Sequence, residues 1–350
     1  MINARYTKYS LHFRTPAGTS RGTLLSKDSW FILVNDDMHP QITGIGECSI
    51  LKGLSMDDRP DIEDMLKLIC AAPLEIWERR DSALAEWPAL RSGLEMALLD
   101  LKNGGQQLLF PSAFTQSLKS IPINGLVWMG QPDYMLQQID EKINSGFRVI
   151  KMKIGAIDFN EELHLLSYIR NQYNKSAIEI RVDANGAFAP EEAPDKLNQL
   201  ARFDIHSIEQ PIKAGQFAIM AELCRQSPIP IALDEELIGI PSHHQAKALL
   251  QTIHPQYIIL KPSLLGGFEA SEKWIKLADD LGIGWWVTSA LESNIGLNAI
   301  AQWTATLNSS MPQGLGTGSL FTNNIPAPLK IKNGALHAES SISWDVSAIL

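Results

Sequence analysis

Seven polar residues recur through the second half of the 350-residue sequence, each at or near the end of a short apolar run. They are Lys151, Lys153, Asp183, Glu209, Asp234, Lys261 and Ser289. From Lys153 onward the successive steps are 25 to 30 residues, the length of one strand, one helix and their loops. In a closed barrel of parallel strands the carboxyl ends surround one mouth. We therefore expect the seven side chains to converge on a single site.

Three of these residues, Asp183, Glu209 and Asp234, are carboxylates. Carboxylates that converge without a positive partner repel one another and resist ionisation. A hard divalent cation relieves that repulsion, and oxygen ligands suit octahedral Mg2+, with Mn2+ as a substitute. The lack of thiol and imidazole groups at these strand ends argues against zinc. The alternative is that the carboxylates form salt bridges with the lysines.

Lys151 and Lys153 share one face of their predicted strand because side chains alternate along a strand. Two ammonium groups near a bound cation destabilise each other's charged form, so one can act as a general base near neutral pH. Lys261 lies four strands further on, as a second acid/base or a stabiliser of a developing anion. The alternatives are a pair of solvated lysines at 151 and 153, and an ion pair of Lys261 with Asp234 or Glu235.

The carboxylates and lysines together indicate one reaction type. A metal that binds both oxygens of a substrate carboxylate stabilises the enediolate that forms when a base removes the α-proton. The expected ligand is therefore a small-molecule carboxylate.

The order of predicted elements changes near residue 119. Residues 1–118 place β-rich runs before amphipathic helices, which is typical of an α+β unit, with a loop at 14–22. Residues 119–320 alternate eight short apolar runs with amphipathic helices, which predicts a barrel of parallel strands. Residues 321–350 contain the hairpin signal Asn333-Gly334 and form a segment expected to return to the first unit.

Composition argues against several classes of protein. Lys and Arg number 30 against 39 Asp and Glu, and the formal charge of −9 argues against a nucleic-acid binder. No run approaches the roughly 18 apolar residues of a membrane span, and the first residues lack the apolar core of a signal peptide. Cys48, Cys70 and Cys224 suggest neither a disulfide framework nor a zinc site. We expect a cytoplasmic protein with no membrane or nucleic-acid partner; the oligomeric state is unknown.

The motifs around these residues resemble the enolase superfamily and, more narrowly, its muconate-lactonizing-enzyme subgroup. They are KMK at 151–153, RVDAN at 181–185, IEQP at 208–211, LDEE at 233–236 and LKP at 260–262. The resemblance implies an α/β fold, a modified (β/α)7β TIM barrel with an N-terminal α+β capping domain. It also implies catalytic Lys153 and Lys261, metal ligands Asp183, Glu209 and Asp234, and Glu235 nearby.

Three further segments are similar to o-succinylbenzoate synthases, a family within that subgroup. They are PAGTSRG at 16–22, TSALESNIG at 288–296 and GLGTGSLFTNN at 314–324. This family dehydrates 2-succinyl-6-hydroxy-2,4-cyclohexadiene-1-carboxylate in menaquinone or phylloquinone synthesis. The resemblance implies that Lys153 abstracts the α-proton and then assists departure of the 6-hydroxyl on the same face, while Lys261 stabilises the anion.

Other functions of the same scaffold stay open. N-succinylamino acid racemases use the same two lysines and metal. Dipeptide epimerases do so too, but they carry an Asp-x-Asp after the last strand, and residues 312–330 contain no Asp. Muconate cycloisomerisation and a non-catalytic binding barrel are the remaining alternatives.

Three residues beside the predicted ligands have candidate supporting roles. Arg181 lies on the same strand face as Asp183 and could pair with a carboxylate or order the ligands, and Asn185 flanks the same aspartate. Ser289 could donate a hydrogen bond to the succinyl carboxylate of the substrate, or cap an ordinary loop.

Overall fold

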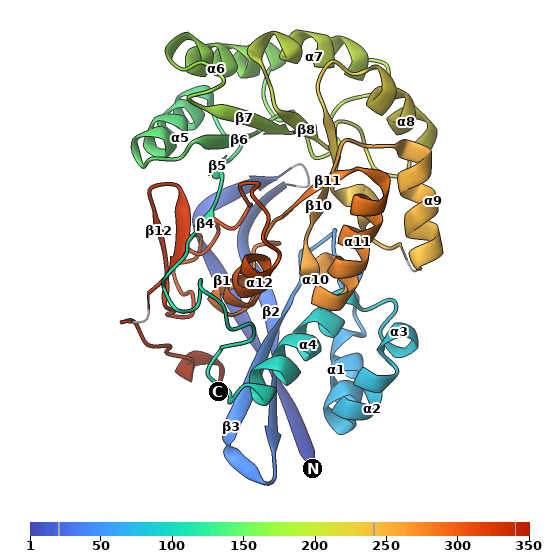
Figure 1. Ribbon diagram of the computed structural model, residues 1–350, viewed down its shortest axis with the longest axis vertical. Helices are drawn as coiled ribbons and strands as arrows, with labels where there is room; N and C mark the ends of the chain where they lie inside the picture. The colour runs from blue at the N-terminus through green and yellow to red at the C-terminus, as the bar shows by residue number, and fades with distance from the viewer. Residues whose placement is uncertain (20–21, 241, 340) are drawn as a thin grey trace.

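The computed structural model describes residues 1–19, 22–240, 242–339 and 341–350 (Figure 1). The chain begins with three antiparallel strands, β1 (Ile2–Thr19), β2 (Gly22–Asp36) and β3 (His39–Ser49), paired in that order. The expected loop at 14–22 is mostly strand, since Ala17 pairs with Leu24 and Gly18 with Thr23. Gly18 also bridges to Met129 of the barrel, where a Cβ would lie 3.1 Å from the Met129 carbonyl oxygen. Residues 20–21 of the 16–22 motif lie outside the described residues.

Strand β2 is buried on both faces. Trp30, Ile32 and Val34 pack in one apolar cluster with the helices that follow β3. Phe31 and Leu33 pack in another cluster, with the C-terminal segment and the last barrel helix. Because successive side chains point to opposite faces of a sheet, a strand with two covered faces reads as an unbroken apolar run rather than an alternating one.

The capping unit is completed by the helices α1 (Ile62–Ala71), α2 (Pro73–Glu78), α3 (Arg80–Ala83) and α4 (Pro88–Lys102). Helix α4 lies close against β3, because glycines face each other across the contact. A Cβ at Gly46 would lie 1.9 Å from the Gly93 carbonyl oxygen, so only glycine fits at this crossing.

The barrel follows as parallel strands with crossover helices, drawn from green to orange in Figure 1. A short strand β4 (Ile121–Pro122) precedes a seven-stranded sheet in the order β11-β10-β9-β8-β7-β6-β5. Its strands are β5 (Gly125–Val127), β6 (Val149–Lys153), β7 (Glu179–Asp183), β8 (Ser207–Glu209), β9 (Ile231–Leu233), β10 (Tyr257–Leu260) and β11 (Gly284–Val287). Its helices are α5 (Pro132–Asn144), α6 (Phe159–Gln172), α7 (Ala193–Leu200), α8 (Phe217–Gln226), α9 (His243–Ile253), α10 (Pro262–Leu265), α11 (Phe268–Leu281) and α12 (Asn294–Thr306).

The eighth predicted strand, at 313–318, is reduced to single bridges. Gln313 bridges in parallel to Ile123, and Gly314 bridges in parallel to Thr288 after β11. These contacts connect the last strand of the sheet to the first part of the barrel. The fold is therefore the expected α/β class, a modified barrel beside an α+β unit.

The C-terminal segment contacts both units. Its hairpin, β12 (Leu329–Lys332) and β13 (Ala335–Ala338), turns at Asn333-Gly334 as expected and pairs with β4. Ile325 and Ile349 instead join the apolar cluster on the capping sheet. We propose a division of the chain into 1–118, 119–320 and 321–350 on the basis of these contacts.

No helix within the described residues has the length and apolar character needed to cross a membrane. Cys48, Cys70 and Cys224 are free, as expected, and Cys48 and Cys224 are buried.

Candidate active site

Three predicted site residues form one rung across neighbouring strands. Lys153 on β6 pairs in register with Asp183 on β7, and Asp183 pairs with Glu209 on β8. Asp234 and Lys261 directly follow β9 and β10. Because these strands are parallel, the five residues lie at the same, carboxyl end of the barrel. The spacing in the sequence thus predicts this convergence correctly.

Lys151 bridges two of the carboxylates. Its Nζ lies 2.9 Å from Asp183 Oδ2 and 2.5 Å from Glu209 Oε2, and the side chain is buried. Burial by itself would lower the pKa of Lys151, but the Asp183 and Glu209 carboxylates raise it above its ordinary value. In this arrangement, two carboxylates outweigh one like charge at Lys151.

Lys153 contacts a carboxylate and an amide. Its Nζ lies 3.0 Å from Asp183 Oδ2 and 2.5 Å from Asn185 Oδ1. Asn185 Nδ2 in turn donates to Glu235 Oε1 over 3.0 Å. Asn185 has a φ of 44°, in the left-handed region that Asn tolerates better than most residues. The turn after β7 therefore sets an amide between Lys153 and Glu235.

Lys261 is paired with Asp234. Burial opposes the charge on Lys261, but Asp234 and then Glu209 raise its pKa above the ordinary range. The pKa of Asp234 is itself raised, mainly by burial, in spite of the Lys261 contact. The structure therefore contains the ion pair of Lys261 with Asp234, and the catalytic role of Lys261 stays a prediction.

The buried carboxylates ionise unequally. Burial would raise the pKa of Asp183, but Lys151 and Lys153 hold it below its ordinary value. Burial raises the pKa of Glu209 to about 8, Asp183 adds to the rise, and Lys151 opposes it. The lysines therefore do not fully offset the effect of burial on Glu209.

The same carboxylates fit a divalent metal ion in their chemistry. Asp183, Glu209 and Asp234 are each almost fully buried and offer only oxygen, the ligand atom of hard cations. Glu209 Oε1 is buried and accepts no hydrogen bond. As the described side chains stand, no three acidic, His or Cys groups are arranged closely enough to hold a metal. Lys151 lies between two of the carboxylates instead.

A cavity of about 550 Å3 includes Lys153 and Asp183 of the rung in its lining and is lined by both units. The barrel contributes Lys151, Lys153, Asp183, Asn185 and Lys261. The capping unit contributes Thr23, Leu24, Leu51, Lys52 and Leu54. The cavity therefore depends on the docking of the capping unit against the barrel mouth.

Ser289 lines the cavity, but its hydroxyl proton is directed elsewhere. Ser289 Oγ donates to Glu292 Oε2 over 2.5 Å and accepts from Thr317 Oγ1 over 2.8 Å and from the Leu291 N–H over 3.1 Å. A serine hydroxyl has one proton to donate and two lone pairs that accept, and these three contacts use all of them. In this arrangement Ser289 acts within the loop, as one of its two alternatives held, and a hydrogen bond from Ser289 to a substrate carboxylate stays a prediction.

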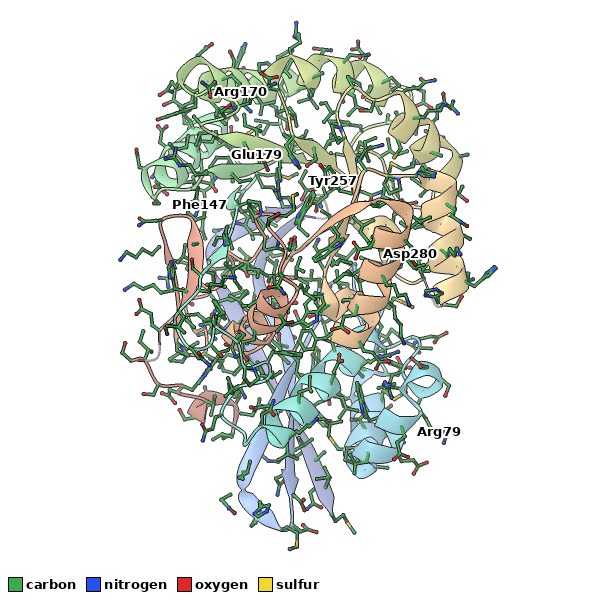
Figure 2. The ribbon with its side chains drawn as sticks, viewed as in Figure 1. Arg79, Phe147, Arg170, Glu179, Tyr257 and Asp280 are labelled. Atoms are coloured by element: carbon green, nitrogen blue, oxygen red, sulfur yellow. The ribbon has the colours of Figure 1, made fainter. Side chains whose placement is uncertain are left out.

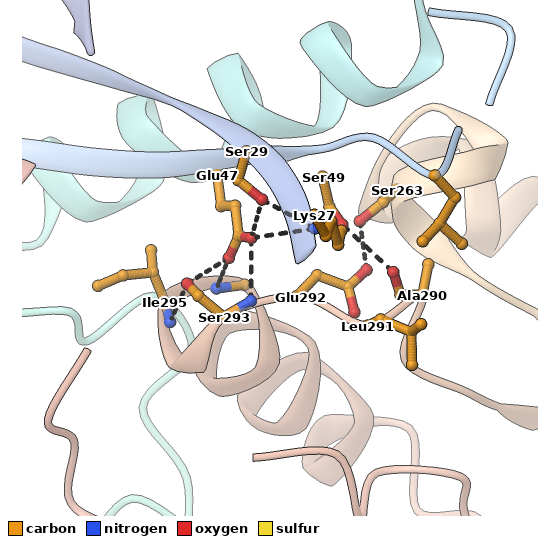
Figure 3. Close-up of polar contacts among 12 residues, drawn as sticks. Lys27, Ser29, Glu47, Ser49, Ser263, Ala290, Leu291, Glu292, Ser293 and Ile295 are labelled. Atoms are coloured by element: carbon orange, nitrogen blue, oxygen red, sulfur yellow. Dashed lines mark hydrogen bonds and ion pairs between the residues drawn. The ribbon is translucent and has the colours of Figure 1, made fainter. Parts of the chain in front are cut away.

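Glu292 belongs to a buried polar cluster between the two units, which includes Lys27 and Glu47 (Figure 3). Glu47 on β3 accepts the N–H groups of Ser293 and Gly296 over 2.9 and 3.0 Å, at the start of α12. Lys27 Nζ lies 3.7 Å from Glu47 Oε1. A carboxylate from the capping unit thus caps a barrel helix and fixes how the units meet.

Arg181 lies in the barrel but does not line the cavity. It pairs with a carboxylate, as one alternative held, but the partner is Glu179 at 2.8 Å, at the start of β7. Its guanidinium also stacks 4.4 Å from the ring centre of Trp286. Figure 2 shows Glu179 and Tyr257, the first residues of β7 and β10, inside the ring of helices. Arg181 does not hydrogen-bond to any of the three candidate metal ligands.

Sequence reasoning missed Lys52, Glu47 and Glu292. Lys52 stands in an ordinary surface turn, and Glu47 is one acidic residue within a strand. Glu292 lies in the TSALESNIG segment, which the sequence singled out as a whole. No spacing connects these residues, since their positions depend on the docking of the capping unit.

Comparison with known proteins places the chain. Residues 134–342 match the family model described as enolase C-terminal domain-like. The o-succinylbenzoate synthase of Desulfotalea psychrophila is 48% identical, over 95% of this chain and 97% of that protein. The crystal structure of MenC from Desulfotalea psychrophila superposes with a TM-score of 0.84 at 44% identity, over 96% of this chain and 99% of the other.

A more distant likeness concerns the fold alone. Muconate lactonizing enzyme from Pseudomonas fluorescens, solved with muconolactone, superposes with a TM-score of 0.82 at 24% identity, over 99% of this chain and 97% of that one. The chain belongs to the enolase superfamily and, within it, to the o-succinylbenzoate synthase family. Members of this superfamily use a divalent metal ion.

Proposed function

We propose that the chain catalyses the dehydration of 2-succinyl-6-hydroxy-2,4-cyclohexadiene-1-carboxylate to o-succinylbenzoate. The observation that carries this function is the placement of Lys153, at the end of β6, and Lys261, directly after β10, on one cavity that the buried Asp183 also lines. The near full-length identity of 48% to an o-succinylbenzoate synthase supports the same reaction.

Lys153 is the proposed base. It removes the proton from C1 of the ring, and the electron pair of that C–H bond moves into the carboxylate to form an enediolate. The electron pair then returns and expels the C6 hydroxyl, which takes the proton from the Lys153 ammonium and leaves as water. One lysine thus acts first as base and then as acid on one face, and the product is aromatic.

Asp183, Glu209 and Asp234 are the proposed metal ligands, and Mg2+ is the proposed ion, with Mn2+ as a substitute. When bound, the ion supplies positive charge that stabilises the enediolate anion. Lys261 holds a positive charge on the opposite side of the cavity, where it stabilises the same anion. Asn185 orients Lys153, and Lys151 and Glu235 balance charge around the ligands.

Racemisation of N-succinylamino acids is the second candidate, because Lys153 and Lys261 would supply a base on each side of a substrate carbon. The absence of Asp from residues 312–330 argues against dipeptide epimerisation, whose substrates carry a free amine. We further propose a cytoplasmic location and no nucleic-acid partner, given the net charge of −9.

The test is to mix the purified protein with the cyclohexadiene substrate, with Mg2+ and then with EDTA. We expect a rapid, metal-dependent loss of diene absorbance, with o-succinylbenzoate identified by mass. No reaction in the presence of metal would refute the proposed function. Exchange of the α-proton of N-succinylamino acids in deuterated water would then test the racemase alternative.

A further inference from the structure

Four lysines line the cavity, and Lys52 differs from the other three. Lys151, Lys153 and Lys261 come from the barrel and are each paired with a carboxylate. Lys52 comes from the capping unit, is exposed, and forms no ion pair with any residue that the structure describes. It is therefore a cation at the cavity whose charge no described protein carboxylate neutralises.

The turn that carries Lys52 is held in place by its own hydrogen bonds. The Leu51 N–H donates to Ser55 Oγ over 2.9 Å, and the Gly53 N–H donates to Asp58 Oδ2 over 2.7 Å. Asp57 then accepts the N–H groups of Ala89 and Leu90, 3.0 and 3.1 Å away, at the start of α4. The backbone around Lys52 is thus anchored to the capping unit, and only its long side chain needs to adjust.

Two neutral donors that line the cavity, Ser289 and Thr317, are already committed. Ser289 donates its proton to Glu292, and Thr317 donates its proton to Ser289. Neither hydroxyl can donate to a second anion without breaking a buried hydrogen bond. The ammonium of Lys52 has three donors and no such commitment.

We propose that Lys52 is the specificity-determining residue that binds the carboxylate on the succinyl side chain of the substrate. This inference rests on the proposed function, whose substrate carries two carboxylates. The carboxylate on the ring is placed beside Lys153, among the charged residues at the carboxyl ends of the barrel strands. The succinyl chain extends away from the reacting carbon, toward the wall that the capping unit supplies, and ends in the second carboxylate.

The experiment is a cycle of two protein forms and two ligands. Wild type and Lys52→Met are titrated with o-succinylbenzoate and with 2-butanoylbenzoate, which lacks the distal carboxylate. We expect Lys52→Met to weaken the binding of o-succinylbenzoate about tenfold, as loss of a hydrogen bond to a charged group does. The affinity for 2-butanoylbenzoate should stay nearly unchanged. In turnover, KM should rise by a similar factor with little change in kcat, because the contact is the same in the ground and transition states.

Lys52→Arg should retain most of the affinity, since it keeps the charge. Lys102→Met is the matched control, because Lys102 is also an exposed lysine of the capping unit but does not line this cavity. The assignment would be overturned if Lys52→Met weakened the binding of both ligands equally, or the binding of neither. A selective loss in Arg21→Met with none in Lys52→Met would overturn it as well; Arg21 precedes Gly22 of the cavity in sequence and lies outside the described residues.

The two proposals fail separately. If wild type does not dehydrate the cyclohexadiene substrate, the proposed function fails, whatever the binding cycle gives. If wild type is active and the binding cycle shows no coupling, only the role of Lys52 fails.

Discussion

Lys153 donates from Nζ to Asp183 Oδ2 over 3.0 Å, so the proposed base and a proposed metal ligand are in direct contact. Their strands bring the two side chains close together, because Lys153 and Asp183 are register partners in adjacent parallel strands. The charge of the proposed base therefore acts directly on the charge of a proposed metal ligand.

Lys153→Ala should reduce kcat by about 10²- to 10⁴-fold, the usual contribution of a positioned acid or base. Binding of Mg2+ and of o-succinylbenzoate should remain close to wild type, because the lysine is not a ligand. Single-turnover kinetics and calorimetry on the same preparation measure both. Activity near that of wild type would remove Lys153 from the mechanism.

Glu209→Gln should weaken Mg2+ binding by at least about tenfold, since even partners outside the ligand shell contribute 10- to 100-fold. Glu209 has a buried oxygen without a hydrogen bond, which a cation would satisfy. Calorimetric titration with Mg2+ measures the affinity. Glu191→Gln, at an exposed position elsewhere in the barrel, is the control. Equal Mg2+ affinity in both variants would contradict ligation by Glu209.

Ser289→Ala should lower stability by about 1–3 kcal/mol, because Glu292 loses a buried hydrogen bond. The affinity for o-succinylbenzoate should stay nearly constant, because the Ser289 proton already goes to Glu292. Denaturant unfolding and product titration separate the two effects. A large loss of product affinity with unchanged stability would instead support the substrate contact that the sequence suggested for Ser289.

Glu95 predicts a pH dependence of stability. Burial raises the pKa of Glu95 to about 7, against opposition from the Phe268 and Glu269 N–H groups. The folded state therefore holds a proton that the unfolded chain releases near pH 4.5. The stabilising contribution is complete below that pH and is lost as the pH rises through about 7.

The size of this contribution is up to about 3 kcal/mol, at about 1.4 kcal/mol per pKa unit. Glu95→Gln cannot titrate, so its free energy of unfolding should fall less than that of wild type between pH 4.5 and 7.5. Denaturant unfolding across this range gives the difference between the two curves. A wild-type stability that rose more steeply than that of the variant would show the opposite sign.

The sequence alone predicts the barrel and the charged residues at the carboxyl ends of its strands. Strand and helix periods repeat at near-constant length from Lys153 to Ser289, and parallel strands deliver their last residues to one end. The motifs also identify Lys261 and its alternative partner Asp234, because these residues follow adjacent strands. Such features depend on chain order and local pattern, so no tertiary knowledge is needed to find them.

Tertiary structure decides which partner each polar group meets. Arg181 and Asp183 share a strand face, but Arg181 lies two residues earlier in the strand. Its guanidinium therefore pairs with Glu179 and does not line the cavity. Ser289 has a hydroxyl in the expected place, but Glu292 takes its proton. The 14–22 segment is mostly strand, and its Gly18 bridges to Met129 of the barrel, where a Cβ would lie close to the Met129 carbonyl oxygen.

The position of Lys52 shows the same division most clearly. Its turn has an ordinary sequence, and nothing in the spacing connects it with the barrel residues. It reaches the cavity only because the capping unit docks there, through contacts such as Glu47 with the start of α12. Sequence patterns indicate the period of the strands and helices within a unit. Contacts between units depend on the shapes of both surfaces, so no periodic pattern in the sequence predicts them.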